Sequence, residues 1–133
     1  MIDEERLEER IAEYLRALNR LMSAVQKPKD EFLRDSVIQR FEFTYELAWK
    51  MLKLRLEAEA LMPRTPKETL QEALQAGFIE DGNAWSELQK KRNLTSHTYD
   101  EELAEEVYAF VAGQGMWLFA QLAEKAAEWR RTV

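Results

Sequence analysis

Apolar side chains recur at three- and four-residue steps along most of the chain, and this spacing constrains the fold more than any other feature. The first stripe, in residues 3–26, contains Leu7, Ile11, Tyr14, Leu15, Leu18, Leu21, Met22 and Val25. Such spacing puts apolar residues on one face of an α-helix. No segment shows sustained alternation of apolar and polar residues, so we expect no strand.

Proline and a capping residue set the limits of the first two helices. Lys27-Pro28 ends the first, and Asp30 suits the N-cap of a second helix that should extend to about residue 61. The second helix carries a main stripe of Val37, Phe41, Tyr45, Ala48, Leu52 and Leu56, and another of Phe43, Leu47 and Leu54. A second stripe indicates either a central helix covered on several sides or a further surface, such as a homodimer interface.

Two shorter helices should follow. Thr65-Pro66-Lys67-Glu68 predicts a capping box at the start of a short helix that Gly77 ends. Asp81-Gly82 then predicts a turn into a helix over residues 83–94.

The last helix should begin at a second capping box, formed by Thr98 and Glu101. Its apolar stripe contains Leu103, Val107, Phe110, Val111, Leu118 and Leu122. Gly113 and Gly115 interrupt this helix, which indicates a kink or a close helix crossing. Short connections favour antiparallel neighbours. We therefore predict an all-α fold, an up-and-down four-helix bundle with one short extra helix, as a single domain over residues 1–133.

Composition excludes several classes of protein. The chain has no cysteine, so it can form no disulfide, thiolate nucleophile or cysteine zinc site, which agrees with a reducing compartment. Met1 is followed by Asp3, Glu4 and Glu5, unlike the basic and then apolar start of a secretory signal. No apolar run approaches the roughly 20 residues of a membrane span. We expect a cytoplasmic protein with no membrane partner.

The charge distribution limits contact with nucleic acid. A formal net charge of -6 argues against a sequence-independent nucleic-acid coat protein, which needs a surplus of Lys and Arg. Basic residues nevertheless enrich the middle of the chain: Lys50, Lys53, Arg55, Arg64, Lys67, Lys90, Lys91 and Arg92. Any RNA contact should therefore be local.

One segment has the residues for chemistry. His97, the only histidine, lies between two predicted helices, where a following helix N-terminus would favour the neutral imidazole of a general base. A bend could bring Arg92 to the same cleft, and its guanidinium would bind phosphate and stabilise a pentacovalent transition state. The imidazole would take the proton of a ribose 2′-hydroxyl, which attacks the adjacent phosphate without any metal. Asn93 could orient either group.

A structural interpretation of the same residues is also open. His97 would then be a hydrogen-bonding group at a junction, Arg92 the ion-pair partner of a nearby glutamate, and Tyr99 a packing aromatic. We interpret the acidic residues of 100–106 as complementing a helix dipole, not as a metal site, and the four tryptophans as core or interface anchors. We predict no metal and no cofactor.

The segment Arg92-Asn93-Leu94-Thr95-Ser96-His97-Thr98-Tyr99 resembles the motif Arg, four residues, His, one residue, Tyr. This motif is typical of HEPN superfamily proteins encoded beside minimal nucleotidyltransferases, the HepT-like toxins and nucleotidyltransferase substrate-binding proteins. The block from Arg40 to Lys50 resembles the long-helix signature of the substrate-binding branch, and with Pro66-Lys67-Glu68 the similarity covers nearly the whole chain. The resemblance implies a HEPN-like bundle, a homodimer whose motifs line a cleft between subunits, and a separate nucleotidyltransferase partner.

The resemblance also implies a role for each motif residue. Arg92 and His97 would be the catalytic pair of a ribonuclease, Asn93 an auxiliary polar group, and Tyr99 the residue that the partner modifies with AMP. Two function classes follow: a ribonuclease toxin that its partner neutralises, or a noncatalytic subunit that presents a substrate to the nucleotidyltransferase. The intact motif favours the first and the acidic net charge favours the second.

Overall fold

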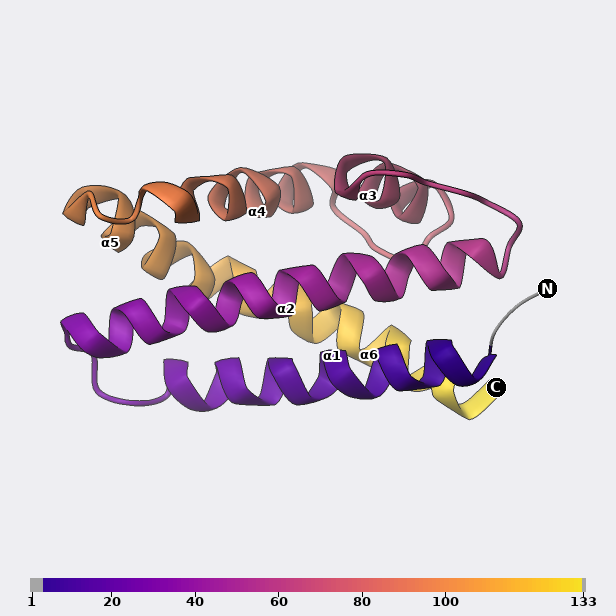
Figure 1. Cartoon of the computed structure of the whole chain (residues 1–133), viewed down its shortest axis with the longest axis horizontal. Coiled ribbons are helices and arrows are strands. Elements are labelled where there is room, and N and C mark those ends of the chain that lie inside the picture. The colour runs from indigo at the N-terminus through magenta and orange to yellow at the C-terminus, as the bar shows by residue number, and fades with distance from the viewer. Residues whose placement is uncertain (1–3, 133) are drawn as a thin grey trace.

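The chain folds into a bundle of α-helices, as the computed structural model of residues 4–132 shows (Figure 1). The helices are α1 (Glu4–Val25), α2 (Glu31–Glu57), α3 (Pro66–Gln75), α4 (Gly82–Leu94), α5 (Glu101–Phe110) and α6 (Met116–Thr132). The 3₁₀ turn η1 (Thr95–His97) follows α4, and the π-helical turn η2 (Val111–Gly115) joins α5 to α6. The predicted all-α bundle is confirmed: α5, η2 and α6 form one kinked helix, and α3 is the short extra helix. Asp3, in the predicted first helix, lies outside the described residues.

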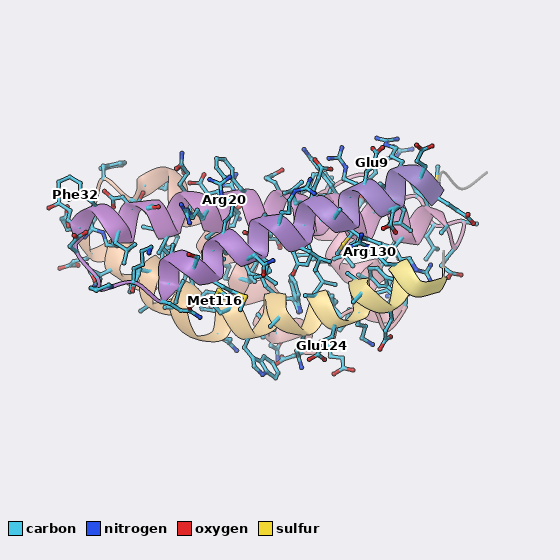
Figure 2. All side chains as sticks on the ribbon, turned by 90° about the horizontal axis from the view of Figure 1, so that it is seen from below. Glu9, Arg20, Phe32, Met116, Glu124 and Arg130 are labelled. Carbon is cyan, nitrogen blue, oxygen red and sulfur yellow. The ribbon has the colours of Figure 1, made fainter. Side chains whose placement is uncertain are left out.

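The two ends of the described chain meet at one end of the bundle. Figure 1 shows α1 and α2 side by side, and Figure 2 shows α6 running along α1. Arg130 Nε in α6 lies 2.6 Å from Glu8 Oε1 in α1 and joins the two helices by an ion pair. No helix in residues 4–132 has an apolar stretch sufficient to cross a bilayer.

Phe119 of α6 lies at the centre of the core. Its ring centroid lies 6.4 Å from that of Tyr14 in α1, 6.0 Å from Phe41 in α2 and 6.2 Å from Trp85 in α4. The buried Tyr14 hydroxyl donates a 2.6 Å hydrogen bond to the Phe119 carbonyl, and burial raises the pKa of Tyr14. One side chain thus packs against aromatic rings from three other helices.

The end of α2 differs from the prediction. The helix stops at Glu57, not near residue 61, because Ala60 adopts a left-handed backbone conformation with φ 62°. The Leu61 N–H donates to the Leu56 carbonyl at 3.0 Å, and the Ala60 N–H to the Glu57 carbonyl at 3.0 Å. This is the Schellman pattern, which glycine usually completes. Gly77 completes it after α3, as predicted.

The second stripe of α2 is only partly covered. The main stripe is buried, whereas Phe43 is 54% exposed and Leu47 and Leu54 are partly buried against the core. The interpretation of α2 as a helix covered on several sides therefore does not hold at Phe43 within one chain, and the alternative, a homodimer interface, stays a prediction. Trp85 and Trp129 are buried as anchors, but Trp117 is 54% exposed.

Candidate functional site

Arg92, in the last turn of α4, faces α2. Its Nη1 donates a 2.9 Å hydrogen bond to Thr95 Oγ1 and lies 3.9 Å from Glu42 Oε2, and its Nη2 lies 3.6 Å from Glu46 Oε1. The Nε–H is buried and has no hydrogen-bond partner among the described residues. Asn93, the next residue, is exposed, and its carbonyl accepts a 3.3 Å hydrogen bond from Ser96 Oγ. The ion pairs agree with the structural interpretation of Arg92.

His97 and Tyr99 pair with each other on the surface. The His97 Nδ1 lies 3.4 Å from the Tyr99 hydroxyl oxygen, and the ring centroids are 6.0 Å apart with an interplanar angle of 71°. His97 is exposed, and Tyr99 is 83% exposed, so the interpretation of Tyr99 as a packing aromatic is wrong. Both functional groups are open to a substrate.

Asp100, not Thr98, caps α5. Its Oδ1 accepts hydrogen bonds from the backbone N–H groups of Glu102 at 2.9 Å and Leu103 at 3.3 Å. The Thr98 hydroxyl instead donates to the Thr95 carbonyl at 3.1 Å, which closes the η1 turn. The predicted Thr98–Glu101 capping box is therefore wrong, because the aspartate directly before the first helical residue takes the role. His97 thus lies three residues before the N-cap of α5, not directly before it as predicted.

A hollow lies between α2 and Tyr99, the last residue of the motif. It is lined by Asp35, Ile38, Gln39 and Glu42 of α2 together with Thr98 and Tyr99. Glu42 also lies 3.9 Å from Arg92, so the arginine and the tyrosine flank the same carboxylate. No hydrogen bond joins Arg92 directly to His97 in residues 4–132. Their convergence on one phosphate stays a prediction.

A buried arginine fixes the α5 end of this segment. Arg34 of α2 is 4% exposed, and its Nη1 donates to Glu101 at 2.7 Å and to Glu105 at 3.1 Å. The hydrogen bond to Glu101 is the main cause that raises the pKa of Arg34. Lys29 also pairs with Glu105, and its hydrogen bond, followed by that of Arg34, lowers the pKa of Glu105. The acidic run after Tyr99 thus holds α5 against α2 and is more than a solvated surface.

Sequence inspection assigned no role to Arg34, Glu42 or Glu46. Arg34 stands in the buried stripe of α2, three residues before Val37, and a charge at such a position marks a paired, buried group. Glu42 and Glu46 are four residues apart, so they share one face of the helix. This spacing could have indicated a basic partner, but not that the partner is Arg92.

Comparison with known proteins identifies the family. The family profile described as nucleotidyltransferase substrate binding protein like matches residues 9–128, which include the whole motif segment. The chain belongs to this family. The predicted resemblance is therefore confirmed for the family and for its bundle fold.

Individual relatives of the family agree with this assignment. A protein named Probable ribonuclease HepT, from Haemophilus influenzae strain Rd, is 46% identical over 77 residues. That alignment covers 54% of the chain and 53% of the relative, so the chain spans about half the length of that protein.

Two solved structures have the same fold. A protein from Thermus thermophilus has a TM-score of 0.73 and 30% identity, covering 89% of this chain and 98% of its own. A Haemophilus influenzae protein, described as revealing the fold of a substrate binding domain of a nucleotidyltransferase, has a TM-score of 0.67 and 30% identity. It covers 94% of this chain and 99% of its own. This chain thus shares its fold with each of the two solved structures over nearly the whole length.

Proposed function

We propose that this chain is the helical subunit of a toxin-antitoxin type system, that a separate minimal nucleotidyltransferase is its partner, and that Arg92–Tyr99 is a ribonuclease site. The observation that carries the proposal is the exposed pair in which His97 Nδ1 lies 3.4 Å from the Tyr99 hydroxyl. Because the base contacts a hydroxyl that can be modified, modification of that hydroxyl would switch off the active site. The family supports the nucleotidyltransferase partner, and the name of the Haemophilus relative supports the ribonuclease site.

The residues of the segment suit RNA cleavage by internal transesterification. The His97 imidazole takes the proton of a ribose 2′-hydroxyl, and the 2′-oxygen forms a bond to the adjacent phosphorus. The bond from phosphorus to the 5′-oxygen breaks, and that oxygen takes a proton from water, which leaves a 2′,3′-cyclic phosphate and a 5′-hydroxyl. The hydroxide so formed takes back the proton from the imidazolium, which restores neutral His97. Arg92 stabilises the extra negative charge on phosphorus with its planar fork, and Asn93 orients the phosphate. No step requires a metal ion.

Tyr99 provides the means of silencing. In this proposal, the Tyr99 oxygen attacks the α-phosphorus of ATP bound to the partner, pyrophosphate leaves, and the phenol proton is lost. The attached AMP then lies against the imidazole, because the two groups are 3.4 Å apart before modification. Its phosphate adds negative charge where the RNA phosphate must bind, so binding is opposed by repulsion.

We further propose a homodimer in which the two motifs line one cleft. The exposed Tyr99 and the open hollow beside it are available to a second copy. Light scattering coupled to size-exclusion chromatography should give twice the 15.7 kDa mass of the chain. A monomer at micromolar concentration contradicts the dimer. It does not contradict the motif chemistry, which the cleavage experiment tests.

The test is RNA cleavage by the purified chain in excess chelator. We expect cleavage, and we expect His97→Ala to reduce its rate by about 10²–10⁴-fold, the usual contribution of a general base. Ser96→Ala is the matched control, since Ser96 is exposed and adjacent but has no role in the chemistry. Activity that survives His97→Ala rejects the assignment of His97 as the general base.

A noncatalytic substrate-binding subunit is the second candidate. The observation in its favour is that Arg92 already has two carboxylates, Glu42 and Glu46, within 3.9 Å. A guanidinium with counter-ions is a weaker phosphate clamp than a free one. Absence of cleavage of every RNA tested, with a stable complex between this chain and the nucleotidyltransferase, favours this function.

A further inference from the structure

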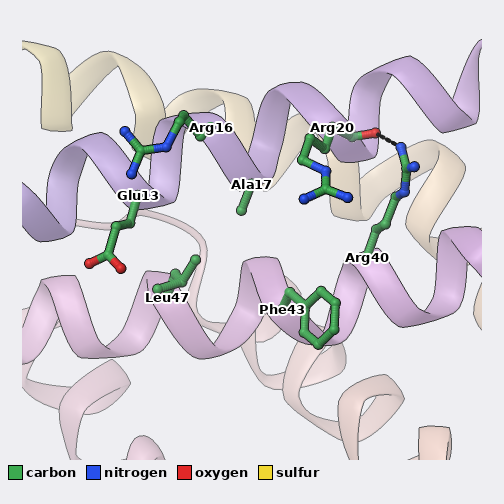
Figure 3. A pocket seen from close by; sticks show the side chains of 7 residues that line it. All are labelled: Glu13, Arg16, Ala17, Arg20, Arg40, Phe43 and Leu47. Carbon is green, nitrogen blue, oxygen red and sulfur yellow. Dashed lines mark hydrogen bonds between the residues drawn. The ribbon is translucent and has the colours of Figure 1, made fainter.

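A basic groove runs between α1 and α2, away from the motif segment. Its lining residues are Glu13, Arg16, Ala17 and Arg20 of α1 and Arg40, Phe43 and Leu47 of α2. Figure 3 shows Arg20 and Arg40 at one end, near Phe43, and Glu13 with Leu47 toward the other. We call these seven residues the arginine groove.

The three arginines of the groove have no acidic partner among residues 4–132. None of their guanidinium groups lies within ion-pair distance of a carboxylate of the described residues, and Arg40 Nη1 donates instead to the Arg20 carbonyl at 2.7 Å. Elsewhere in the chain arginines do pair with carboxylates: Arg10, Arg34, Arg55, Arg92 and Arg130. Glu13, the acidic residue of the groove, pairs with Arg10 at 3.1 Å. The arginine groove is therefore an uncompensated positive surface on a protein of net charge -6.

Phe43 gives the groove an aromatic surface. Its side chain is 54% exposed beside Arg40, and Leu47 continues the apolar wall one turn further along α2. An exposed aromatic ring beside guanidinium groups is the combination that binds single strands, since bases stack on the ring and phosphates bind the cations.

We infer that the arginine groove binds a single-stranded segment of RNA, with a base on Phe43 and successive phosphates on the arginines. Figure 3 shows Arg16 apart from Arg20 and Arg40, so the groove has more than one cationic position along its length. This spread favours a strand over a mononucleotide. The inference rests on the proposed function only in taking RNA as the substrate.

The position of the groove relative to the motif agrees with a continuous path for the strand. The groove and the Tyr99 hollow are on two flanks of α2, since Phe43 lines the first and Glu42 the second. A helix with its side chains is about 10–12 Å across, so a strand of a few nucleotides can reach both. The groove would then hold the substrate while the motif acts on it.

The test measures binding alone, so that it does not depend on catalysis. A fluorescent single-stranded RNA of about ten nucleotides is titrated with the His97→Ala protein, and anisotropy gives the affinity. We expect Phe43→Ala to weaken binding by about 5- to 100-fold, as loss of a stacked base does. Arg20→Gln with Arg40→Gln should weaken it by about tenfold or more and lower the slope of log K against log salt by about 0.7 per arginine.

Matched controls separate the groove from general surface effects. Phe32→Ala removes another exposed phenylalanine of α2, and Arg64→Gln removes a positive charge outside the groove. Neither should change the affinity by more than about twofold, because neither side chain lines the groove. Circular dichroism confirms that each variant folds.

Four results would overturn the inference. The first is that the protein with an intact groove does not bind the RNA, and the second is that the control variants lose as much affinity as the groove variants. The third is equal affinity for AMP and the RNA. The fourth is loss of a dimer in the groove variants, which would make the groove an interface between copies. Binding through the groove by a chain that cleaves no RNA leaves the inference standing and rejects only the ribonuclease proposal.

Discussion

Arg92 forms ion pairs that a phosphodiester would have to replace in the proposed ribonuclease. Its nitrogens lie 3.6 Å from Glu46 and 3.9 Å from Glu42, longer than the roughly 2.7–2.9 Å of a charge-assisted hydrogen bond. A phosphate that accepts two N–H groups from the planar fork is bound more firmly than either carboxylate at these distances. In the proposed ribonuclease, the carboxylates would hold the guanidinium in place until a phosphate binds.

Arg92→Ala and Arg92→Lys test whether the planar fork matters beyond its charge. We expect alanine to lower kcat/KM for RNA cleavage by about 10²–10³-fold, the loss typical of one transition-state donor. Lysine should recover little of this, because an ammonium cannot bind phosphate and Glu46 with the same geometry. Full activity of the lysine variant would show that a positive charge at this position is sufficient.

Tyr45, next to Arg92, makes the stability of the native state depend on pH in the alkaline range. Burial raises the pKa of Tyr45 to about 12, and the ordinary value is about 10. Between these values the native state keeps the proton that the unfolded state releases, so stability is complete below pH 10 and falls toward pH 12. Urea unfolding at about pH 8 and about pH 11 should show a smaller alkaline loss for Tyr45→Phe, by about 1–2 kcal/mol. Identical losses would contradict the burial of the hydroxyl.

At this scale the sequence predicted some contacts and not others. An ion pair of Arg92 with a glutamate was one of the interpretations and is present, whereas the contact of His97 with Tyr99 was not predicted. The contacts of Arg92 with Glu42 and Glu46 depend on how α4 packs against α2. Spacing within one helix does not determine that packing.

Helix starts were predictable where one capping residue stood alone. Asp30 caps α2 and Thr65 caps α3, each accepting a hydrogen bond from a backbone N–H three residues on. Before α5, Thr98 and Asp100 both have suitable side chains, and the choice depends on the η1 turn that engages Thr98. Local sequence therefore could not decide between the two residues.

Asp100→Ala tests the cap and its link to the site. The loss of two hydrogen bonds to backbone N–H groups should lower the free energy of unfolding by about 1 kcal/mol. Thr98→Val is the control, since Thr98 donates only to the Thr95 carbonyl, and it should cost less. Urea unfolding measures both. A larger loss of unfolding free energy in the threonine variant would indicate that Thr98, not Asp100, is the N-cap.

At the scale of the whole molecule, Phe119 tests how the bundle is held together. Phe119→Ala removes a fully buried ring that contacts α1, α2 and α4, and should lower the free energy of unfolding by about 3–5 kcal/mol. Trp117→Ala removes a larger but half-exposed ring two residues earlier and should cost far less, about 1 kcal/mol or below. Similar costs would contradict the placement of the core.

The periodicity of apolar residues predicted the bundle, because each helix must bury one face and that face is apolar at three- and four-residue steps. It did not predict Phe119 as the central residue, since the predicted last stripe included Leu118 and Leu122 but not Phe119. It also could not show that Phe43 stays uncovered, because exposure depends on where α1 crosses α2. The arginine groove was missed for the same reason, since Arg16, Arg20 and Arg40 come from two helices.

The proposed ribonuclease function requires cleavage of RNA through a ribose 2′-hydroxyl at the Arg92–Tyr99 segment. The direct measurement uses an RNA that the chain cleaves at a mapped position and the same RNA with a single 2′-deoxyribose there, in excess chelator. We predict a 2′,3′-cyclic phosphate at the cut end of the first, identified by mass spectrometry, and no cut at the altered position of the second. Continued cleavage at the deoxyribose would contradict the account.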